Sequence, residues 1–343
     1  MFARRYGLVA VILLRHVVHL ILHIGPHKTG SSYLQRRFYK DHDILMENGV
    51  LYPINDWIGG GHGHAYLVDK KQLSSIGDEL NRIAKDKPSL KSVVISTENF
   101  DRLSRDDIKI LREKITIPTT VVYYLRRMDK TLFANWQEDV KFGSLETFSR
   151  FLLRHFAFPI ESKIVNHSVV VDLWADVFGK SAISIVDYDD LVGTDTDIYC
   201  HFVETFCGIN DVATPSNARE NVSFSPVDSE ILRIMHMFAK DKKQCGTNIV
   251  TKRFYELFNS KHALLDDARS VIAFGSKPFA VGESVVFRKM FTEFEENYKD
   301  RIVSRNLQFR SGSVEIIDDY WFQSDNLRGA LERIYAELVN GVQ

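Results

Sequence analysis

A short polar turn follows the first apolar stretch of the chain and gathers several side chains capable of chemistry. Residues 17–25 read VVHLILHIG, and the next stretch, PHKTGSSYLQ, holds Lys28, Thr29, Ser31 and Ser32. An apolar, β-branched run that ends in glycine predicts a buried strand, and the serines suit the first turn of a helix. A strand, a glycine turn and a helix N-terminus direct several backbone N–H groups at one point. The sequence therefore predicts a site for a phosphate or sulfate group, with a lysine beside it.

The position of the lysine separates this turn from the loop of nucleotide triphosphatases. That loop reads G-x-x-x-x-G-K-[ST], and the Ser or Thr after its lysine holds magnesium. Gly25 and Gly30 have the matching spacing, but Ser31 stands where the lysine would be, and Lys28 lies inside the turn. No aspartate pair nearby supplies a metal site. A magnesium-dependent ATPase is therefore disfavoured, and so is a purely structural corner, because buried polar side chains are costly without a purpose.

Further polar residues stand at the ends of other predicted strands. Three apolar runs predict strands in addition to the first: residues 92–97, 119–127 and 182–191. Helix-like patterns alternate with them, which favours an α/β fold with a parallel sheet flanked by helices. In such sheets ligands bind beyond the carboxyl ends of the strands. Glu98, Arg126 and Arg127 lie at these ends, so we expect them to converge with Lys28.

Composition adds few constraints of its own. The net charge of −1 over 343 residues gives no global argument for a nucleic-acid partner, so an anion site must be local. Three cysteines, Cys200, Cys207 and Cys245, show no metal-ligand spacing, so we expect no bound metal. An odd and sparse set of cysteines favours a reducing compartment, and we expect a cytoplasmic protein.

The N-terminal segment is apolar but interrupted. Arg15, His16 and His19 break the run MFARRYGLVAVILLRHVVHLILHIG, whereas a membrane span needs about 20 apolar residues. No small-residue cleavage site for a signal peptide precedes the polar turn. We expect residues 1–16 to form a soluble extension, with weak peripheral membrane association as the alternative. Residues 17–343 are predicted to form a single domain, divided into a nucleotide-binding α/β core (17–195) and a mostly helical acceptor-side portion (196–343).

Two motifs in the correct order resemble those of a known family. The stretch GPHKTGSSYLQ resembles the 5′-phosphosulfate loop of the sulfotransferases, P-x-K-[ST]-G-T-T-x-L, with two serines in place of the threonines. Residues 121–143, VVYYLRRMDKTLFANWQEDVKFG, resemble the family's second signature, which grips the 3′-phosphate of the sulfate donor. Residues 173–191 and 219–226 also look like stretches of bacterial carbohydrate-type sulfotransferases. The resemblance thus covers residues 17 to 226 and implies a P-loop NTPase-like sulfotransferase fold with a helix-rich C-terminal portion.

The resemblance implies transfer of a sulfuryl group from 3′-phosphoadenosine 5′-phosphosulfate (PAPS) to a hydroxyl of a carbohydrate or glycolipid. In that reading Lys28 stabilises the bridging oxygen of the donor as it departs, and Arg126 binds the 3′-phosphate. Prepositioned N–H groups and a cation lower the barrier because charge builds on the leaving phosphate, and no metal is expected. The expected donor-binding residues of the loop are Pro26, His27, Lys28, Thr29, Gly30, Ser31 and Ser32.

One departure affects the 3′-phosphate site. The family usually has a serine eight residues after the arginine, and this chain has Ala134 there, with Asn135 beside it. Either Asn135 substitutes for the serine, or the 3′-phosphate is held by Arg126 and new partners. For Arg127 two roles remain open: it contacts the ligand, or it forms a salt bridge with a neighbouring residue.

The general base is not fixed by the motifs. Some relatives place a glutamate eight residues beyond the lysine, and that position is Arg36 here. Glu98 is the first candidate, and its alternative role is a carboxylate that organises the site by pairing with Lys28 or Arg126. His64, in the glycine-rich loop GGGHGHAY, is the second candidate and His62 the third.

A further polar loop and two rival functions complete the predictions. Arg219, Asn221 and Ser223 match a loop that lies near the nucleotide or acceptor in relatives, although a polar turn explains them equally well. The first rival function is a magnesium- and ATP-dependent small-molecule kinase. The second is a non-catalytic sulfonucleotide-binding protein, for which Ala134 is the hint. The acceptor's identity and the oligomeric state are not readable from these patterns.

Overall fold

The computed structural model describes residues 17–59, 62–210, 223–281, 284–303, 312–317 and 324–340. The extension expected at residues 1–16, and the loop residues Arg219 and Asn221, lie outside the described residues.

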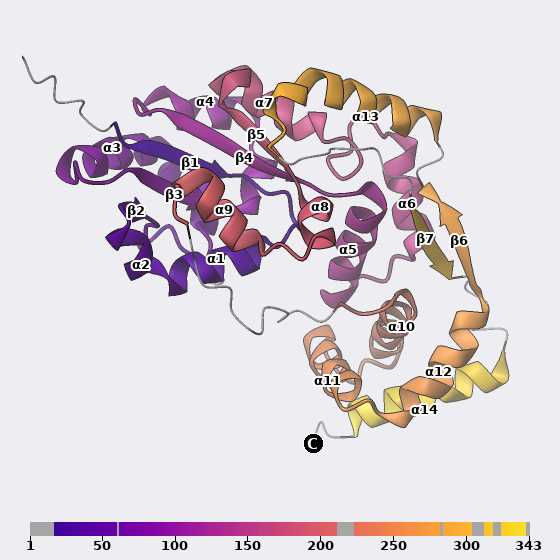
Figure 1. Cartoon of the computed structure of the whole chain (residues 1–343). Coiled ribbons are helices and arrows are strands. Elements are labelled where there is room, and N and C mark those ends of the chain that lie inside the picture. The colour runs from indigo at the N-terminus through magenta and orange to yellow at the C-terminus, as the bar shows by residue number, and fades with distance from the viewer. Residues whose placement is uncertain are drawn as a thin grey trace, which may run out of the picture.

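A five-stranded parallel sheet forms the centre of the first part of the chain, in the order β2-β3-β1-β4-β5 (Figure 1). The strands are β1 (His19–His23), β2 (Val50–Leu51), β3 (Ser92–Ser96), β4 (Thr119–Leu125) and β5 (Ile183–Asp187). All four pairings in the sheet are parallel, which confirms the predicted α/β class. The strand that precedes the polar turn lies between β3 and β4. The three carboxyl ends that carry predicted site residues are therefore neighbours.

Helices cover both faces of this sheet. The helices of the first part are α1 (Ser31–Lys40), α2 (His42–Glu47), α3 (Lys70–Asp86), α4 (Arg105–Glu113), α5 (Met128–Lys141), α6 (Phe148–Ala157), α7 (Ser168–Phe178), α8 (Tyr188–Gly193) and α9 (Ile198–Cys207). Leu20 and Leu22 of β1 pack in one apolar cluster with α3, α4 and α7, and Ile21 packs in another with α1 and α9. Because successive strand side chains point to opposite faces, a continuous apolar strand is buried on both.

The second part of the chain is mainly helical. Its helices are α10 (Pro226–Lys242), α11 (Thr247–Asn259), α12 (Ala263–Phe274), α13 (Val285–Tyr298) and α14 (Asp325–Val339). An antiparallel pair, β6 (Ser276–Ala280) and β7 (Ser313–Ile317), interrupts the helices of this portion, which was expected to be mostly helical. Helix α13 returns to the sheet, because Phe294 and Tyr298 belong to the apolar cluster of α3, α4 and α7.

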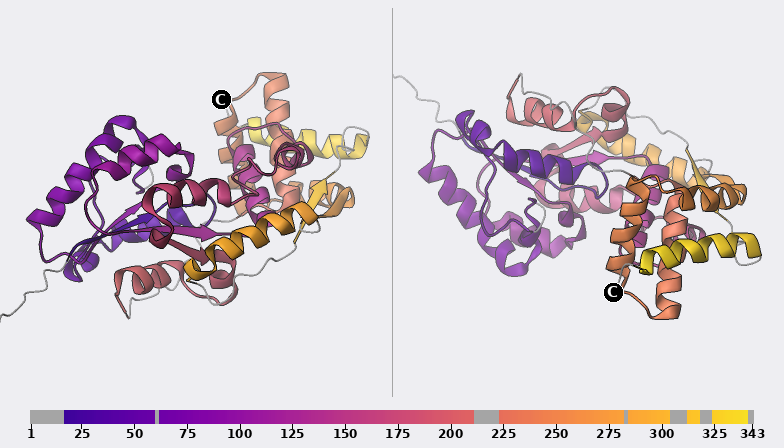
Figure 2. Two further views of the ribbon diagram at one scale, coloured as in Figure 1. Left: turned by 90° about the horizontal axis from the view of Figure 1, so that it is seen from above. Right: turned by 90° about the horizontal axis from the view of Figure 1, so that it is seen from below.

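Helix α5 joins the two parts. Leu132, Trp136 and Val140 of α5 belong to a third apolar cluster with α6, α10, α11, α12 and α14. Figure 2 shows the sheet and the C-terminal helices lying side by side, and Figure 1 shows α5 between them. The helix that follows β4 therefore carries one face toward the C-terminal helices and leaves another beside the polar turn. The division expected at residue 195 stays a prediction.

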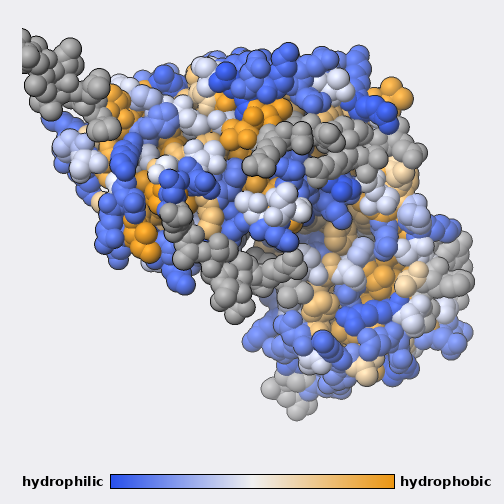
Figure 3. Space-filling model, in the orientation of Figure 1, coloured by the Kyte–Doolittle hydropathy of each residue, from blue (hydrophilic) through white to orange (hydrophobic). Residues whose placement is uncertain are grey.

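The visible surface is mostly hydrophilic, with apolar side chains in small separate groups (Figure 3). Among the described residues, no helix combines the length and the apolar composition needed to cross a membrane.

Candidate functional site

The polar turn after β1 depends on left-handed backbone conformations. Gly30 precedes α1 with φ +77°, and no side chain hydrogen-bonds at this helix start. A methyl group at Gly30 would meet Cδ1 of Ile198, so a side chain there would displace Ile198 in addition to taking a left-handed backbone. Lys28 also has a positive φ, of +68°. A non-glycine residue in this region costs roughly 1–3 kcal/mol and is found most often at functional sites.

The turn opens into a cleft of about 920 Å³ between the sheet and the C-terminal helices. Several predicted site residues line it: His27, Lys28, Gly30, Ser31, Ser32, Glu98, Arg126 and Ser223. The carboxyl ends of β1, β3 and β4 thus contribute to one cavity, as the strand order requires.

Arg126 is tied directly to the turn. Its guanidinium Nη1 donates a hydrogen bond to the backbone carbonyl of Lys28, and the group lies 5.3 Å from the centre of the Tyr188 ring. Its Nε is buried and has no hydrogen-bond partner among the described residues. An unsatisfied buried donor is costly. Arg126 thus carries one unsatisfied buried donor, at Nε, in a side chain that also lines the cleft.

The Lys28 side chain pairs with a residue that sequence reasoning missed. Its Nζ lies 2.6 Å from Oε2 of Glu138, on α5. Both side chains remain partly exposed, at 26% for Lys28 and 38% for Glu138. The predicted pairing of Lys28 with Glu98 is not the arrangement found.

Glu98 hydrogen-bonds to a residue of α1 instead. Nε2 of Gln35 donates to Oε2 of Glu98 at 2.6 Å, and it also lies 3.4 Å from the hydroxyl of Ser96. That hydroxyl in turn contacts Nδ1 of His23 at 2.8 Å. Burial lowers the pKa of His23 to about 4, although the nearby Glu98 opposes the shift. A series of hydrogen bonds thus runs from the buried His23 of β1 through Ser96 and Gln35 to Glu98 at the cleft.

His64 does not reach the cleft. It is fully buried, its Nε2 donates to the carbonyl of Pro53 at 2.8 Å, and its Nδ1 accepts from the N–H of Ser96 at 3.1 Å. Burial lowers the pKa of His64 to about 4. Both nitrogens already have partners, so the prediction of a base is corrected to a role in holding the loop against β3. His62 stacks on the ring of Tyr39 and does not line the cleft either.

Three residues predicted to contact the sulfate donor do not line the cleft: Pro26, Thr29 and Asn135. The buried Thr29 hydroxyl donates to the Pro26 carbonyl at 2.7 Å and holds the shape of the turn. The amide of Asn135 donates to the carbonyl of Thr131, one turn earlier on α5. Ala134 lines the cleft, whereas Asn135 does not, so the structure does not place Asn135 where the missing serine hydroxyl would be.

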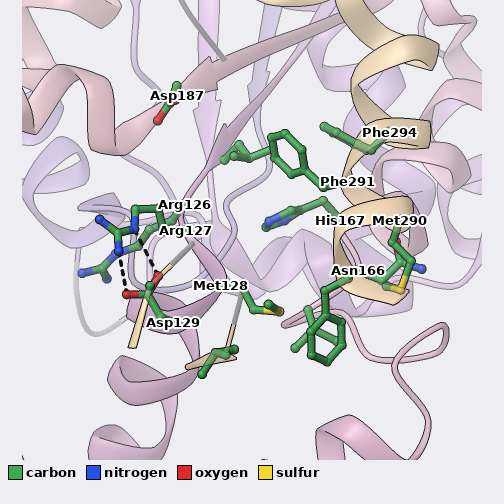
Figure 4. A pocket seen from close by; sticks show the side chains of 15 residues that line it. Arg126, Arg127, Met128, Asp129, Asn166, His167, Asp187, Met290, Phe291 and Phe294 are labelled. Carbon is green, nitrogen blue, oxygen red and sulfur yellow. Dashed lines mark hydrogen bonds and ion pairs between the residues drawn. The ribbon is translucent and has the colours of Figure 1, made fainter. Parts of the chain in front are cut away.

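Arg127 belongs to a different pocket. Its Nε and Nη2 donate to the two carboxylate oxygens of Asp129, at 3.1 and 3.0 Å. This pair lines a small cavity of about 40 Å³. Figure 4 shows both polar groups, such as His167 and Asp187, and apolar groups, such as Phe294, around it. The open question about Arg127 is thereby answered in favour of a salt bridge with a neighbour.

One face of α5 forms the wall opposite the turn. Its lining residues are Lys130, Phe133, Ala134, Gln137, Glu138 and Lys141. The ammonium of Lys141 lies 5.1 Å from the ring centre of Phe224 and 5.7 Å from that of Tyr255. Burial lowers the pKa of Lys141. Of these residues only Ala134 was named from the sequence, although their helical spacing after Arg126 is the signal that could have found the others.

The charge of the cleft favours an anionic ligand. Of the described residues, four basic side chains line it (Lys28, Arg126, Lys130 and Lys141) against two carboxylates, Glu98 and Glu138. A local excess of positive charge thus exists in a chain whose net charge is −1. Within the described part of the chain, no group of three or more His, Cys, Asp or Glu side chains is arranged to hold a metal ion.

Comparisons with known proteins give one structural likeness. The chain is similar in structure to a sulfotransferase from Alicyclobacillus acidocaldarius, with a TM-score of 0.36 and 11% sequence identity. The match covers 64% of this chain and 91% of that protein. No protein-family model and no curated protein matches the sequence. The functional assignment therefore rests on the residues and geometry of the cleft.

Proposed function

We propose that this protein is a sulfotransferase that moves the sulfuryl group of PAPS to a hydroxyl of a carbohydrate or glycolipid. The observation that carries the proposal is the meeting of Lys28, Arg126 and the start of α1 in one basic cleft. This arrangement suits a donor with two separated phosphate groups. The sequence order of the two motifs, which resembles that of the sulfotransferases, supports the same assignment. We further propose a cytoplasmic location, from the sparse cysteines.

The residues of the turn would bind the phosphosulfate end of the donor. The uncapped N-terminus of α1 offers backbone N–H groups to an anion, with the Ser31 and Ser32 side chains beside them. Lys28 would stabilise the charge on the phosphate oxygen from which the sulfuryl group departs. It is free to do so once its pairing with Glu138 is exchanged for the donor.

Arg126 and Lys130 would bind the 3′-phosphate. The Arg126 side chain lines the cleft, and Lys130 lies one helical turn before Ala134 on the same face of α5. A cation on this face would compensate for the serine hydroxyl that Ala134 lacks. This assignment replaces Asn135, whose amide is bonded within its own helix.

Transfer of labelled sulfate tests the proposal. Purified protein is incubated with ³⁵S-labelled PAPS and a panel of mono- and disaccharides and glycolipids, without added metal. We expect label in at least one acceptor and loss of roughly 10²–10³-fold in kcat for Lys28→Ala, as for removal of one stabilising group from a charged transition state. Lys71→Ala, on the exposed side of α3, serves as the matched control. Full transfer by Lys28→Ala would remove this residue from the mechanism, and phosphorylation by ATP–Mg in place of sulfation would favour the kinase.

A further inference from the structure

The ion pair between Lys28 and Glu138 connects the turn to the opposite wall of the cleft. The two atoms are 2.6 Å apart, and both side chains are partly exposed. Ion pairs between solvent-accessible groups contribute little to stability, so this one is readily exchanged. A phosphate held by the N-terminus of α1 offers Lys28 a stronger, charge-assisted partner. The Glu138 carboxylate would then lose its partner and would remain next to the position that the Lys28 ammonium had occupied.

The surroundings of Glu138 place it on the acceptor side. Tyr255 of α11 lines the same cleft. Burial raises the pKa of its hydroxyl, the nearby charge of Glu138 raises it further, and that of Lys28 lowers it. Glu138 therefore lies between the turn and the C-terminal helices. An acceptor that enters beside α11 would meet this carboxylate.

Glu98 is held differently from Glu138. Its carboxylate accepts the hydrogen bond from Gln35, and its backbone packs against the turn, since a methyl group at Gly25 would lie 3.1 Å from Cα of Glu98. This hydrogen bond and the close packing of its backbone hold the Glu98 carboxylate in one place beside α1. The buried chain through Ser96 to His23 fixes this arrangement. Glu98 is thus suited to hold α1 and the turn in place.

We propose that Glu138 is the general base of the transfer and that Glu98 is a positioning residue; this rests on the proposed sulfotransferase function. Donor binding draws Lys28 from Glu138 to the bridging oxygen. Glu138 then takes the proton from the acceptor hydroxyl, whose oxygen forms a new bond to sulfur. The bond from sulfur to the bridging oxygen breaks, and its electron pair stays on the 5′-phosphate beside Lys28. Until the donor binds, the Glu138 carboxylate is therefore occupied by its ion pair with Lys28.

Two variants separate the roles of the carboxylates. Glu138→Gln removes the base and also the resting partner of Lys28. We therefore expect kcat for transfer from ³⁵S-labelled PAPS to the best saccharide of the panel to fall about 10²–10⁴-fold. We expect its affinity for adenosine 3′,5′-bisphosphate, measured by calorimetry, to be unchanged or tighter. Asp139→Asn, the exposed neighbour on α5, is the control and keeps wild-type values in both measurements.

Glu98→Gln should behave differently, because loss of a positioning residue disturbs donor binding. We expect weaker binding of the bisphosphate and a higher KM for PAPS, with a smaller fall in kcat than for Glu138→Gln. If Glu138→Gln keeps kcat within threefold of wild type, or loses bisphosphate binding, the assignment of Glu138 is overturned. If wild-type protein neither binds the bisphosphate nor transfers sulfate, the proposed function fails, independently of Glu138.

Discussion

At the residue scale, the proposed 3′-phosphate site would use the charge of Lys130 in place of a missing hydroxyl. Ala134 occupies the position of the usual serine, and Lys130 precedes it by one turn on the same face of α5. The side chain of Asn135, which sequence proximity favoured, bonds to the Thr131 carbonyl instead. Proximity in sequence therefore did not indicate which side chain faces the ligand, because neighbouring residues on a helix point in different directions.

Restoring the hydroxyl should tighten donor binding. Ala134→Ser adds one donor to the cleft, and a hydrogen bond is worth about 0.5–1.5 kcal/mol, so we expect roughly 2- to 10-fold tighter binding of adenosine 3′,5′-bisphosphate. Lys130→Ala should weaken the same ligand. Calorimetry with adenosine 5′-monophosphate is the control, since it lacks the 3′-phosphate and should respond to neither change. Equal effects on both nucleotides would contradict the proposed placement of the 3′-phosphate.

The sequence predicted several site residues because each stands at a strand end. Lys28, Glu98 and Arg126 all line the cleft. Glu138 was missed because it lies more than two turns along α5, where one residue looks like any other charged position on a helix. His64 was overvalued, since a glycine-rich loop suggested mobility, whereas two backbone hydrogen bonds fix the ring in the core.

At the scale of elements, the turn and α1 depend on close approach to α9. Gly30 combines a φ of +77° with a methyl position only 2.3 Å from Ile198. The apolar contacts of Ile198 place α9 against α1 in the same cluster. The turn and the start of α1 are thus packed against α9, a helix that lies outside both sequence motifs.

Gly30→Ala should therefore unfold the turn locally. The left-handed conformation alone costs about 1–2 kcal/mol, and the contact with Ile198 adds to it. We expect a loss of about 2 kcal/mol or more in the free energy of unfolding, measured in urea, and no measurable bisphosphate binding. Gly193→Ala, where the added methyl has nothing within 4 Å, should leave both quantities near wild type. Wild-type binding by Gly30→Ala would show that the turn does not need its observed conformation.

At the scale of the whole molecule, the fold could be predicted where apolar strands alternate with helices. The strands at residues 92–97 and 119–127 correspond to β3 and β4, and the parallel class is confirmed. Helix α3 and the β6–β7 pair were not predicted. The strands β6 and β7 are more than 30 residues apart, and β6 is largely exposed, so neither shows the apolar pattern of a core strand.

Buried histidines should make the whole fold sensitive to acid. His23, His64 and His167 are buried, and burial lowers the pKa of each from 6.5 to about 4. Between these values the unfolded chain binds protons that the folded chain does not, so stability falls as pH decreases from 6.5 to 4. The slope is at most about 1.4 kcal/mol per pH unit for each histidine.

Urea unfolding at pH 7 and pH 4.5 measures this loss. The amide variant His64→Gln cannot titrate, so we expect a smaller difference between the two pH values than in the wild type, whatever its stability at pH 7. A partly exposed histidine provides the control, since His42→Gln should keep the wild-type difference. Equal pH dependence in wild type and His64→Gln would contradict the burial of a neutral ring at this position.

The most direct test of the central claim is calorimetric binding of adenosine 3′,5′-bisphosphate to the wild-type protein in the presence of EDTA. We expect saturable binding at one site per chain, weakened by Lys28→Ala and by Arg126→Ala. In a parallel titration with the metal present, we expect no binding of ATP–magnesium of comparable strength. Absence of bisphosphate binding, together with binding of ATP–magnesium, would contradict the central claim and would make the cleft that of a kinase.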